Sequence, residues 1–169
     1  TVGSSSTLNA QQWVEFVTSS SFHVTSTDAI MIGQYLVSQE YYGSDPDWGD
    51  PAYALVVPSE QYRTSYSFLV PDTMTYNFAN IIKPVGAPNA PTITMDGVAL
   101  DESEFSLAIG DSYFGVARIN LTDDSRFNGQ YYHVIESTQP FGIQVYGFAR
   151  FTSYFYPGGL DLNIINAAE

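Results

Sequence analysis

The feature that most constrains the fold is a series of short runs rich in β-branched and aromatic residues, separated by turn residues along most of the chain. In Thr92–Leu100 (TITMDGVAL), Asp96-Gly97 joins two such runs, and this pair tolerates the positive backbone angles of a tight hairpin. No stretch has a convincing helical pattern. The pattern predicts an all-β fold, a β-sandwich or jelly-roll-like barrel of about ten or more short, mostly antiparallel strands.

Two segments near the start of the chain carry specific expectations. Trp13–Ser26 alternates on both sides of Ser19–Ser21, which predicts a hairpin. Asp28–Ser38 is ambiguous between helix and strand by periodicity. Its residues favour a buried strand with a bulge at Gly33.

The second half of the chain continues with short strands. Tyr131–Glu136 and the aromatic-rich Phe141–Tyr154 are expected as two separate strands. Glycines 142 and 147 are expected to mark bends or bulges in the second of them. Leu160–Ile165 is a candidate for one last strand.

The length of 169 residues is typical of a single domain, which would bury about 70% of the surface that its unfolded chain exposes. Residues 1–8 are small and polar at their centre and are expected to be a linker from an upstream region. We therefore expect residues 9–169 to form one β-sandwich binding domain. The chain has no cysteine, which excludes disulfides and thiolate chemistry.

The net charge of −13 limits the kinds of partner. Nucleic acid and anionic membrane surfaces are bound by clustered basic groups, and this chain has a single lysine (Lys83) and four arginines. No segment of about 20 apolar residues is present, so membrane insertion is not expected. The acidic composition suits a calcium-rich exterior, which predicts an extracellular or cell-surface location.

The most unusual loop lies between Tyr41 and Ala52 and contains Asp45, Asp47 and Asp50 on a turn shaped by proline and glycine. Three carboxylates this close could converge on one hard cation, and calcium is the metal that fits oxygen ligands of this kind. The spacing is not that of an EF-hand. The alternative is an acidic solvated loop whose aspartates bond their own backbone amides, with no cofactor.

Aromatic residues suggest a ligand-binding role for the same loop. Trp48 lies among the aspartates, while Tyr154 and Tyr156 precede the Pro157–Gly159 turn. Aromatic side chains at loop tips commonly grip sugar rings and protein partners. The predicted ligand-binding residues are Asp45, Asp47, Trp48, Asp50, Tyr154 and Tyr156. Core packing explains the aromatic residues as well.

Catalysis is weakly indicated. Gly110-Asp111-Ser112 is similar to a lipase block, but no Asp-x-x-His follows it, and a nucleophilic serine needs a positioned histidine base. His23 and His133 lack zinc-ligand spacing. The acid pair Glu102 and Glu104 is open to a glycosidase interpretation, but chance explains such pairs in a chain this acidic.

Several blocks together carry a family resemblance: Gly49-Asp50-Pro51-Ala52, Pro58 with Glu60-Gln61-Tyr62, Pro140-Phe141-Gly142-Ile143, and Tyr154 to Gly159. They resemble the IgGFc-binding protein N-terminal domain family. The resemblance implies a β-rich, non-catalytic module of large extracellular adhesive proteins. The absence of cysteine departs from the disulfide-rich animal modules and points to a bacterial surface or fibre protein.

These observations predict a non-catalytic binding or adhesion module, at the tip of or within a larger cell-surface or fibre protein. It would recognise a glycan or protein ligand through end loops, and could form a homo-oligomer through an upstream stalk. A structural spacer or oligomerisation domain is the first alternative. A carbohydrate-active enzyme is the second.

Overall fold

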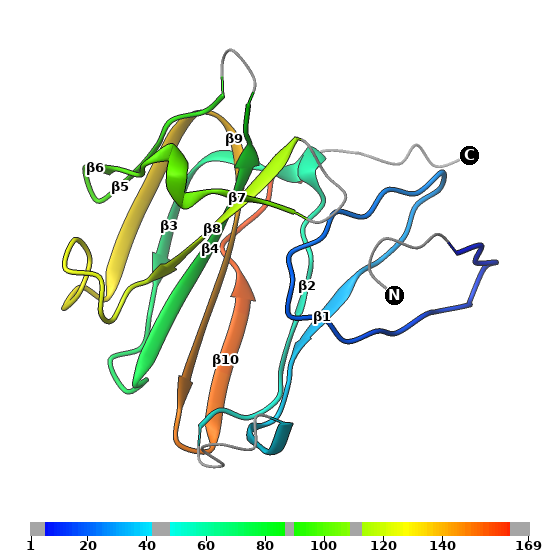
Figure 1. Cartoon of the computed structure of the whole chain (residues 1–169), viewed down its shortest axis with the longest axis horizontal. Helices are drawn as coiled ribbons and strands as arrows, with labels where there is room; N and C mark the ends of the chain where they lie inside the picture. The colour runs from blue at the N-terminus through cyan, green and yellow to red at the C-terminus, as the bar shows by residue number, and fades with distance from the viewer. Residues whose placement is uncertain (1–5, 42–47, 87–89, 109–112, 163–169) are drawn as a thin grey trace.

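The computed structural model describes residues 6–41, 48–86, 90–108 and 113–162 (Figure 1). In this part of the chain all strand pairs are antiparallel, which confirms the all-β class. The strands are β1 (Gly33–Leu36), β2 (Ala52–Leu55), β3 (Arg63–Leu69), β4 (Tyr76–Pro84), β5 (Ile93–Met95), β6 (Val98–Ala99), β7 (Ser106–Leu107), β8 (Phe114–Asn120), β9 (Tyr132–Ala149) and β10 (Thr152–Pro157). Three short 3-10 helices connect them: η1 (Gln39–Tyr41), η2 (Ser59–Gln61) and η3 (Glu102–Glu104).

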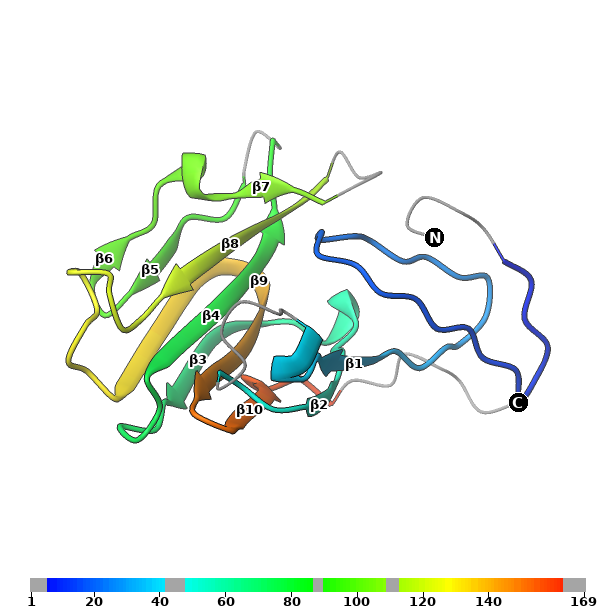
Figure 2. The same cartoon turned by 60° about the horizontal axis from the view of Figure 1, so that its bottom comes forward.

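Strand β9 organises the fold because its 18 residues take part in two sets of pairings. Its first half pairs with β3 on one side and β5 on the other, and its second half pairs with β10 and β4. One half of the sheet therefore runs β6-β5-β9-β3, and the other runs β7-β8-β4-β9-β10. Figure 1 and Figure 2 show the sheet curling so that the inner faces of both halves enclose one core.

The join between the two halves explains how β9 tolerates a proline. Residues 138–140 of β9 have no ladder partner in the described part of the chain, because β5 pairs only as far as Ser137 and the β4 pairing begins at Gly142. Pro140, which has no N–H to donate, lies in this unpaired stretch. The two strands expected at Tyr131–Glu136 and Phe141–Tyr154 are thus one strand, which ends at Ala149 and turns into β10.

The predicted bend or bulge is absent at Gly147, which lies within regular ladders with β4 and β10, whereas Gly142 directly follows the irregular stretch of β9 between Glu136 and Phe141. At both positions the missing side chain makes room for a tyrosine ring. A Cβ on Gly142 would lie 2.4 Å from Cζ of Tyr62, and a Cβ on Gly147 would lie 2.5 Å from Cε1 of Tyr154. Close ring packing, rather than backbone bending, requires glycine at both positions.

The short hairpin predicted at Asp96-Gly97 is confirmed. Strands β5 and β6 pair on either side of it, and Asp96 and Gly97 have φ angles of 51° and 82°. Two consecutive positive φ angles are typical of a type I′ turn.

Expectations for the N-terminal third are only partly met. Residues 12–18 and 23–32 form no ladder, and Thr27–Asp28 is a bend, although the rings of Phe16 and Phe22 meet at 5.0 Å across the bend at Ser19–Ser20. A hairpin with no third strand is marginal in water. Of Asp28–Ser38 only β1 forms a strand, and it pairs with β2 beside the main sheet, so it is not buried. Gly33 lies in register opposite Leu55 without a bulge.

The chain's single lysine lies in the core. Lys83 is 0% exposed, and its Nζ donates to the backbone oxygen of Pro91 at 2.7 Å. The same ammonium forms an ion pair with Glu102 and lies 4.3 Å from the ring centroid of Phe105. An ammonium so deeply buried requires such partners, so Lys83 ties β4 to the segment before β5 and to η3.

A surface ion cluster predicts how stability depends on acid. The guanidinium of Arg126 donates to Glu104 at 2.9 Å and to Asp124 at 2.7 Å. These hydrogen bonds lower the pKa of both carboxyl groups. A lowered pKa contributes stability that is full above the ordinary carboxyl pKa of about 4 and is lost as pH falls through the lowered values.

We therefore expect the stability difference between the wild type and Arg126→Gln to be largest near neutral pH and to shrink below about pH 4. Urea unfolding across this pH range measures it. Arg118→Gln is the matched control, since Arg118 donates to the Ser21 hydroxyl at 3.0 Å instead of to a carboxylate. A difference that does not depend on pH would contradict the role of the cluster.

Candidate functional site

The chain before β2 is anchored to the end of β9. Trp48 forms an isolated antiparallel bridge with Arg150, and the N–H of Gly49 donates to the backbone oxygen of Ala149 at 2.9 Å. These bonds fix the described side of the acidic loop at one end of the fold, next to the turn between β9 and β10 (Figure 1). We name this region the Trp48 end, and it consists of residues 48–50 and 150–153.

The indole of Trp48 starts an aromatic layer on the outer face of the sheet. Its ring lies 5.1 Å from Tyr76, and Phe78 of β4 stacks on Tyr146 of β9 at 5.1 Å. Trp48 is half-buried by this packing. Part of the indole remains accessible, so the layer holds Trp48 in place and leaves an aromatic surface at the end of the fold.

Phe151 is the most unusual residue of this region. It stands in the two-residue turn between Ala149 and Thr152, with a φ of 53° and 52% of its surface exposed. The guanidinium of Arg150 lies 5.1 Å from its ring centroid. A bulky residue with positive φ costs about 1–2 kcal/mol relative to an ordinary backbone conformation. An exposed ring kept at such a position is a reason to consider a binding role.

Of the three predicted calcium ligands, the structure describes Asp50. Asp45 and Asp47 lie outside the described residues. Asp50 is exposed, and its N–H donates to Oγ of Ser153 at 2.9 Å. Within the described ranges, no group of three or more histidine, aspartate or glutamate side chains could hold a metal ion. Calcium binding by Asp45, Asp47 and Asp50 stays a prediction.

Two other predicted ligand residues face away from Trp48. The Tyr154 hydroxyl donates to Oδ1 of Asn77 at 2.7 Å, and the Tyr156 hydroxyl donates to the backbone oxygen of Leu69. Both rings are half-buried against the core, and burial raises the pKa of both hydroxyls. Asn77 and Tyr76 are neighbours in β4 and point to opposite faces, so Tyr154 and Trp48 lie on opposite sides of the sheet. The ligand role of Tyr154 and Tyr156 stays a prediction.

Sequence reasoning missed Phe151 because Arg150-Phe151 contains no turn residue. The sequence predicts strand interior here, since glycine, asparagine and aspartate are the usual signals for a two-residue hairpin turn. No local pattern in this stretch could have revealed it.

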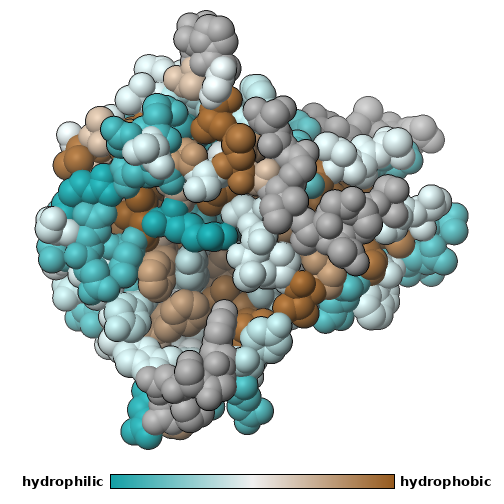
Figure 3. Space-filling model, viewed as in Figure 1, coloured by the Kyte–Doolittle hydropathy of each residue, from teal (hydrophilic) through white to brown (hydrophobic). Residues whose placement is uncertain are grey.

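A second exposed aromatic pair was also missed. Tyr35 of β1 and Tyr53 of β2 are direct register partners, with ring centroids 4.7 Å apart. Both rings are exposed, on the side of the two-stranded sheet that carries Leu55. On the face of the molecule that Figure 3 shows, hydrophobic residues reach the surface in several separate places between hydrophilic ones.

The residues weighed for catalysis have structural partners. His133 is 0% exposed, with Nδ1 2.6 Å from Oδ2 of Asp96 and its ring stacked on Phe68. A histidine with no exposed surface cannot reach a substrate. Glu102 forms its ion pair with Lys83, and Glu104 forms its ion pair with Arg126. Gly110-Asp111-Ser112 lies outside the described residues.

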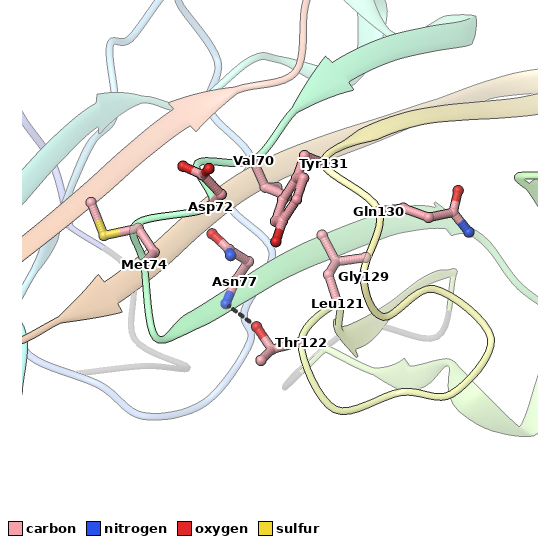
Figure 4. A pocket seen from close by; sticks show the side chains of 9 residues that line it. All are labelled: Val70, Asp72, Met74, Asn77, Leu121, Thr122, Gly129, Gln130 and Tyr131. Carbon is pink, nitrogen blue, oxygen red and sulfur yellow. Dashed lines mark hydrogen bonds between the residues drawn. The ribbon is translucent and has the colours of Figure 1, made fainter.

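Two of the hollows on the surface of the described residues are candidates for a ligand site. The one in Figure 4, about 110 Å³, lies at the end of the fold where β9 begins, and Asn77 and Thr122 hydrogen-bond in its wall at 2.9 Å. Its lining residues are Val70, Asp72, Met74, Asn77, Leu121, Thr122, Gly129, Gln130 and Tyr131. The other, about 290 Å³, lies along β3. The first is well below the 300–1,000 Å³ typical of small-molecule sites and the second is at its lower end, which favours an extended surface for recognition.

Comparison with known proteins gives one match. A family model described as IgGFc binding protein matches residues 1–147. No curated protein and no solved structure matches the chain. None of the helices in the described ranges has the length and apolar character needed to cross a membrane.

Proposed function

The chain belongs to the IgGFc-binding protein family, and from this membership we propose that it is an extracellular, non-catalytic binding module that recognises a protein or glycan ligand through the Trp48 end. Family membership supports the binding role and the extracellular location. The ligand class, an adhesive role at a cell surface, a bacterial source and assembly through an upstream stalk belong to the proposal alone.

The observation that carries the choice of surface is Phe151. It is exposed, and its positive φ costs free energy in a two-residue turn where glycine, asparagine or aspartate would cost less. Trp48 adds a second aromatic face, while Arg150 and Asp50 add charges of opposite sign. Flat aromatic faces with a polar rim suit sugar rings and protein surfaces alike.

The test is a screen of the whole chain against a glycan array and a panel of extracellular proteins that includes the immunoglobulin G Fc fragment. We expect Phe151→Gly to abolish the signal while raising the free energy of unfolding by about 1 kcal/mol, because glycine adopts positive φ freely. A gain in stability with a loss of binding excludes a folding defect as the cause. Urea unfolding of the variant measures the stability change.

Tyr113→Ala is the matched control, since Tyr113 is 51% exposed and directly precedes β8 where Phe114 pairs with Pro84, at the end of β4 away from Tyr76. Binding that survives Phe151→Gly and Trp48→Ala would refute the proposed surface. Repeating the screen with a calcium chelator tests the metal site. Binding that is lost with the chelator supports calcium at Asp45, Asp47 and Asp50. Binding that persists shows that recognition does not require calcium.

A structural role in a larger assembly is the second candidate. It is favoured by the large apolar side chains that residues 8–31 leave exposed. Such side chains are typical of a surface that another chain covers.

A further inference from the structure

One edge of β3 is open. The N–H of Val70 donates to the backbone oxygen of Tyr131. Because hydrogen-bonded positions alternate along an antiparallel pair, the backbone N–H and C=O groups of Tyr66 and Phe68 also point toward β9. The intervening residues Ser65 and Ser67 therefore direct their N–H and C=O groups to the opposite side. In the described part of the chain no strand pairs with this side of β3.

The hydrogen-bond pattern on β9 agrees with this assignment. Asp96 N–H donates to the Val134 oxygen at 2.9 Å, which places Val134 and Glu136 of β9 on the β5 side. The alternate residues His133 and Ile135 then face β3.

A groove runs along the open edge. It measures about 290 Å³ and is lined by Arg63, Ser65, Tyr66, Ser67, Gly158 and Gly159. Apart from Tyr66 and Arg63, the residues that line the groove are serines and glycines. The backbone of another segment can therefore approach β3 closely. Arg63 is the charged residue of the lining, and its guanidinium has no carboxylate partner among the described residues. An extended segment with an acidic side chain fits this edge.

The N-terminal part of the same chain contains such a segment. Residues 13–18 (WVEFVT) follow a drawn-out course beside the main sheet (Figure 1), are rich in strand-forming residues and belong to no helix or strand. Trp13 is 78% exposed, and Val14 and Val17 are also exposed. Phe16 makes its ring contact with Phe22, within the same segment of chain. Glu15 is exposed and makes no hydrogen bond or ion pair with a described residue.

We propose that residues 13–18 of one copy of the chain add as a strand to the open edge of β3 in a second copy, with Glu15 pairing with Arg63. Backbone bonds to Ser65 and Ser67 extend the sheet by one strand. Because side chains alternate along a strand, placing Glu15 on the face of Arg63 puts Val14 and Phe16 on the other face, the side of Tyr66 and Phe68. The exchange covers exposed apolar side chains and an unpaired sheet edge together.

The first measurement uses a fluorescent peptide of residues 11–20 (QQWVEFVTSS) titrated with the whole chain and followed by anisotropy. Ser67→Pro removes the outward N–H, which an edge strand tolerates, and is expected to weaken binding by on the order of tenfold or more. Ser67→Ala keeps the N–H, loses the same contact with the Tyr132 hydroxyl, and is expected to bind within about twofold of the wild type. Circular dichroism verifies that both variants fold.

A charge swap tests the register. Arg63→Glu is expected to weaken binding of the natural peptide, and a peptide carrying Glu15→Arg is expected to restore it. Failure of the swapped peptide to recover affinity would overturn the pairing of these two residues.

The second measurement is sedimentation of the whole chain over a range of concentrations. We expect self-association that is lost in Ser67→Pro and in the double variant Val14→Ser, Phe16→Ser. A peptide that binds while the chain stays monomeric overturns the role of a second copy. Equal binding by Ser67→Pro and Ser67→Ala overturns the strand addition itself. Neither result bears on ligand binding at the Trp48 end, which uses other residues.

Discussion

Replacing Gly147 by alanine is expected to destabilise the protein by about 3 kcal/mol, because the new methyl group has no space. Its Cβ would lie 2.5 Å from Cε1 of Tyr154 and 2.6 Å from the backbone oxygen of Tyr76. The tyrosine ring is held by its hydrogen bond to Asn77, and the carbonyl belongs to the central strand β4. Neither neighbour can move without disturbing the sheet. Urea unfolding monitored by circular dichroism measures the loss.

Gly115→Ala is the matched control. The nearest atom to its added Cβ is Cγ1 of Val85 at 2.8 Å, which belongs to a side chain that can rotate. We expect a cost of about 1 kcal/mol or less there. Similar losses in the two variants would show that strand glycines matter here through backbone propensity, and would contradict the packing explanation.

The second large effect is expected at high pH, where four tyrosines favour the folded state only while they are protonated. Burial raises the pKa of Tyr62 to about 12 and raises the pKa of Tyr66, Tyr154 and Tyr156. The last three donate their hydroxyl hydrogen to an oxygen atom, which would repel a phenolate.

A raised pKa contributes stability that is fully present below the unfolded value of about 10 and is lost as pH rises through the folded values. We therefore expect the protein to unfold cooperatively above about pH 10, with several protons released in one step. Far-ultraviolet circular dichroism and tyrosinate absorbance, recorded together, test this, because both signals should change at the same pH.

Tyr154→Phe should make this transition less steep, since one proton fewer is released. Tyr131→Phe, at an exposed position, should leave the steepness unchanged. Tyrosinate absorbance that rises well before the circular dichroism changes would mean that these hydroxyls ionise in the folded protein, contrary to the prediction.

Local features of the fold could be predicted from the sequence. Asp96-Gly97 determines its own turn, because the backbone preferences of those two residues suffice. The sequence of β4 also shows alternating large and small or polar side chains, but it does not show which of the two sets faces the core. Tyr76 and Phe78 point outward into the aromatic layer, while Asn77 and Lys83 point inward. Pairing with Tyr154 and Glu102, distant in the sequence, decides this orientation.

Long-range contacts account for the errors in the predicted fold. Gly142 and Gly147 look like strand breakers until Tyr62 and Tyr154 are placed over them. Pro140 looks like a strand boundary until the missing partners on both sides of β9 are known. In each case the deciding residue belongs to another strand, and no window of sequence contains both.

The candidate site was half predictable. Trp48 and Asp50 drew attention through an unusual local composition, and the structure places both at one end of the fold. Phe151 has no such signal, because only its φ of 53° distinguishes it from any aromatic residue of a strand. Its importance follows from strain and exposure, which are properties of the folded chain.

The position of β9 after β1 to β8 in the chain determines the order in which the elements of this fold can pair. Both halves of the sheet pair through this strand, so a growing chain that stops before residue 132 contains only hairpins and the β4-β8-β7 group. Neither half can close until β9 has emerged, and pairing β3 with it closes a loop of more than 60 residues. Most of the long-range pairing of this fold therefore forms only after β9 has been synthesised, which makes the order of folding depend on one strand.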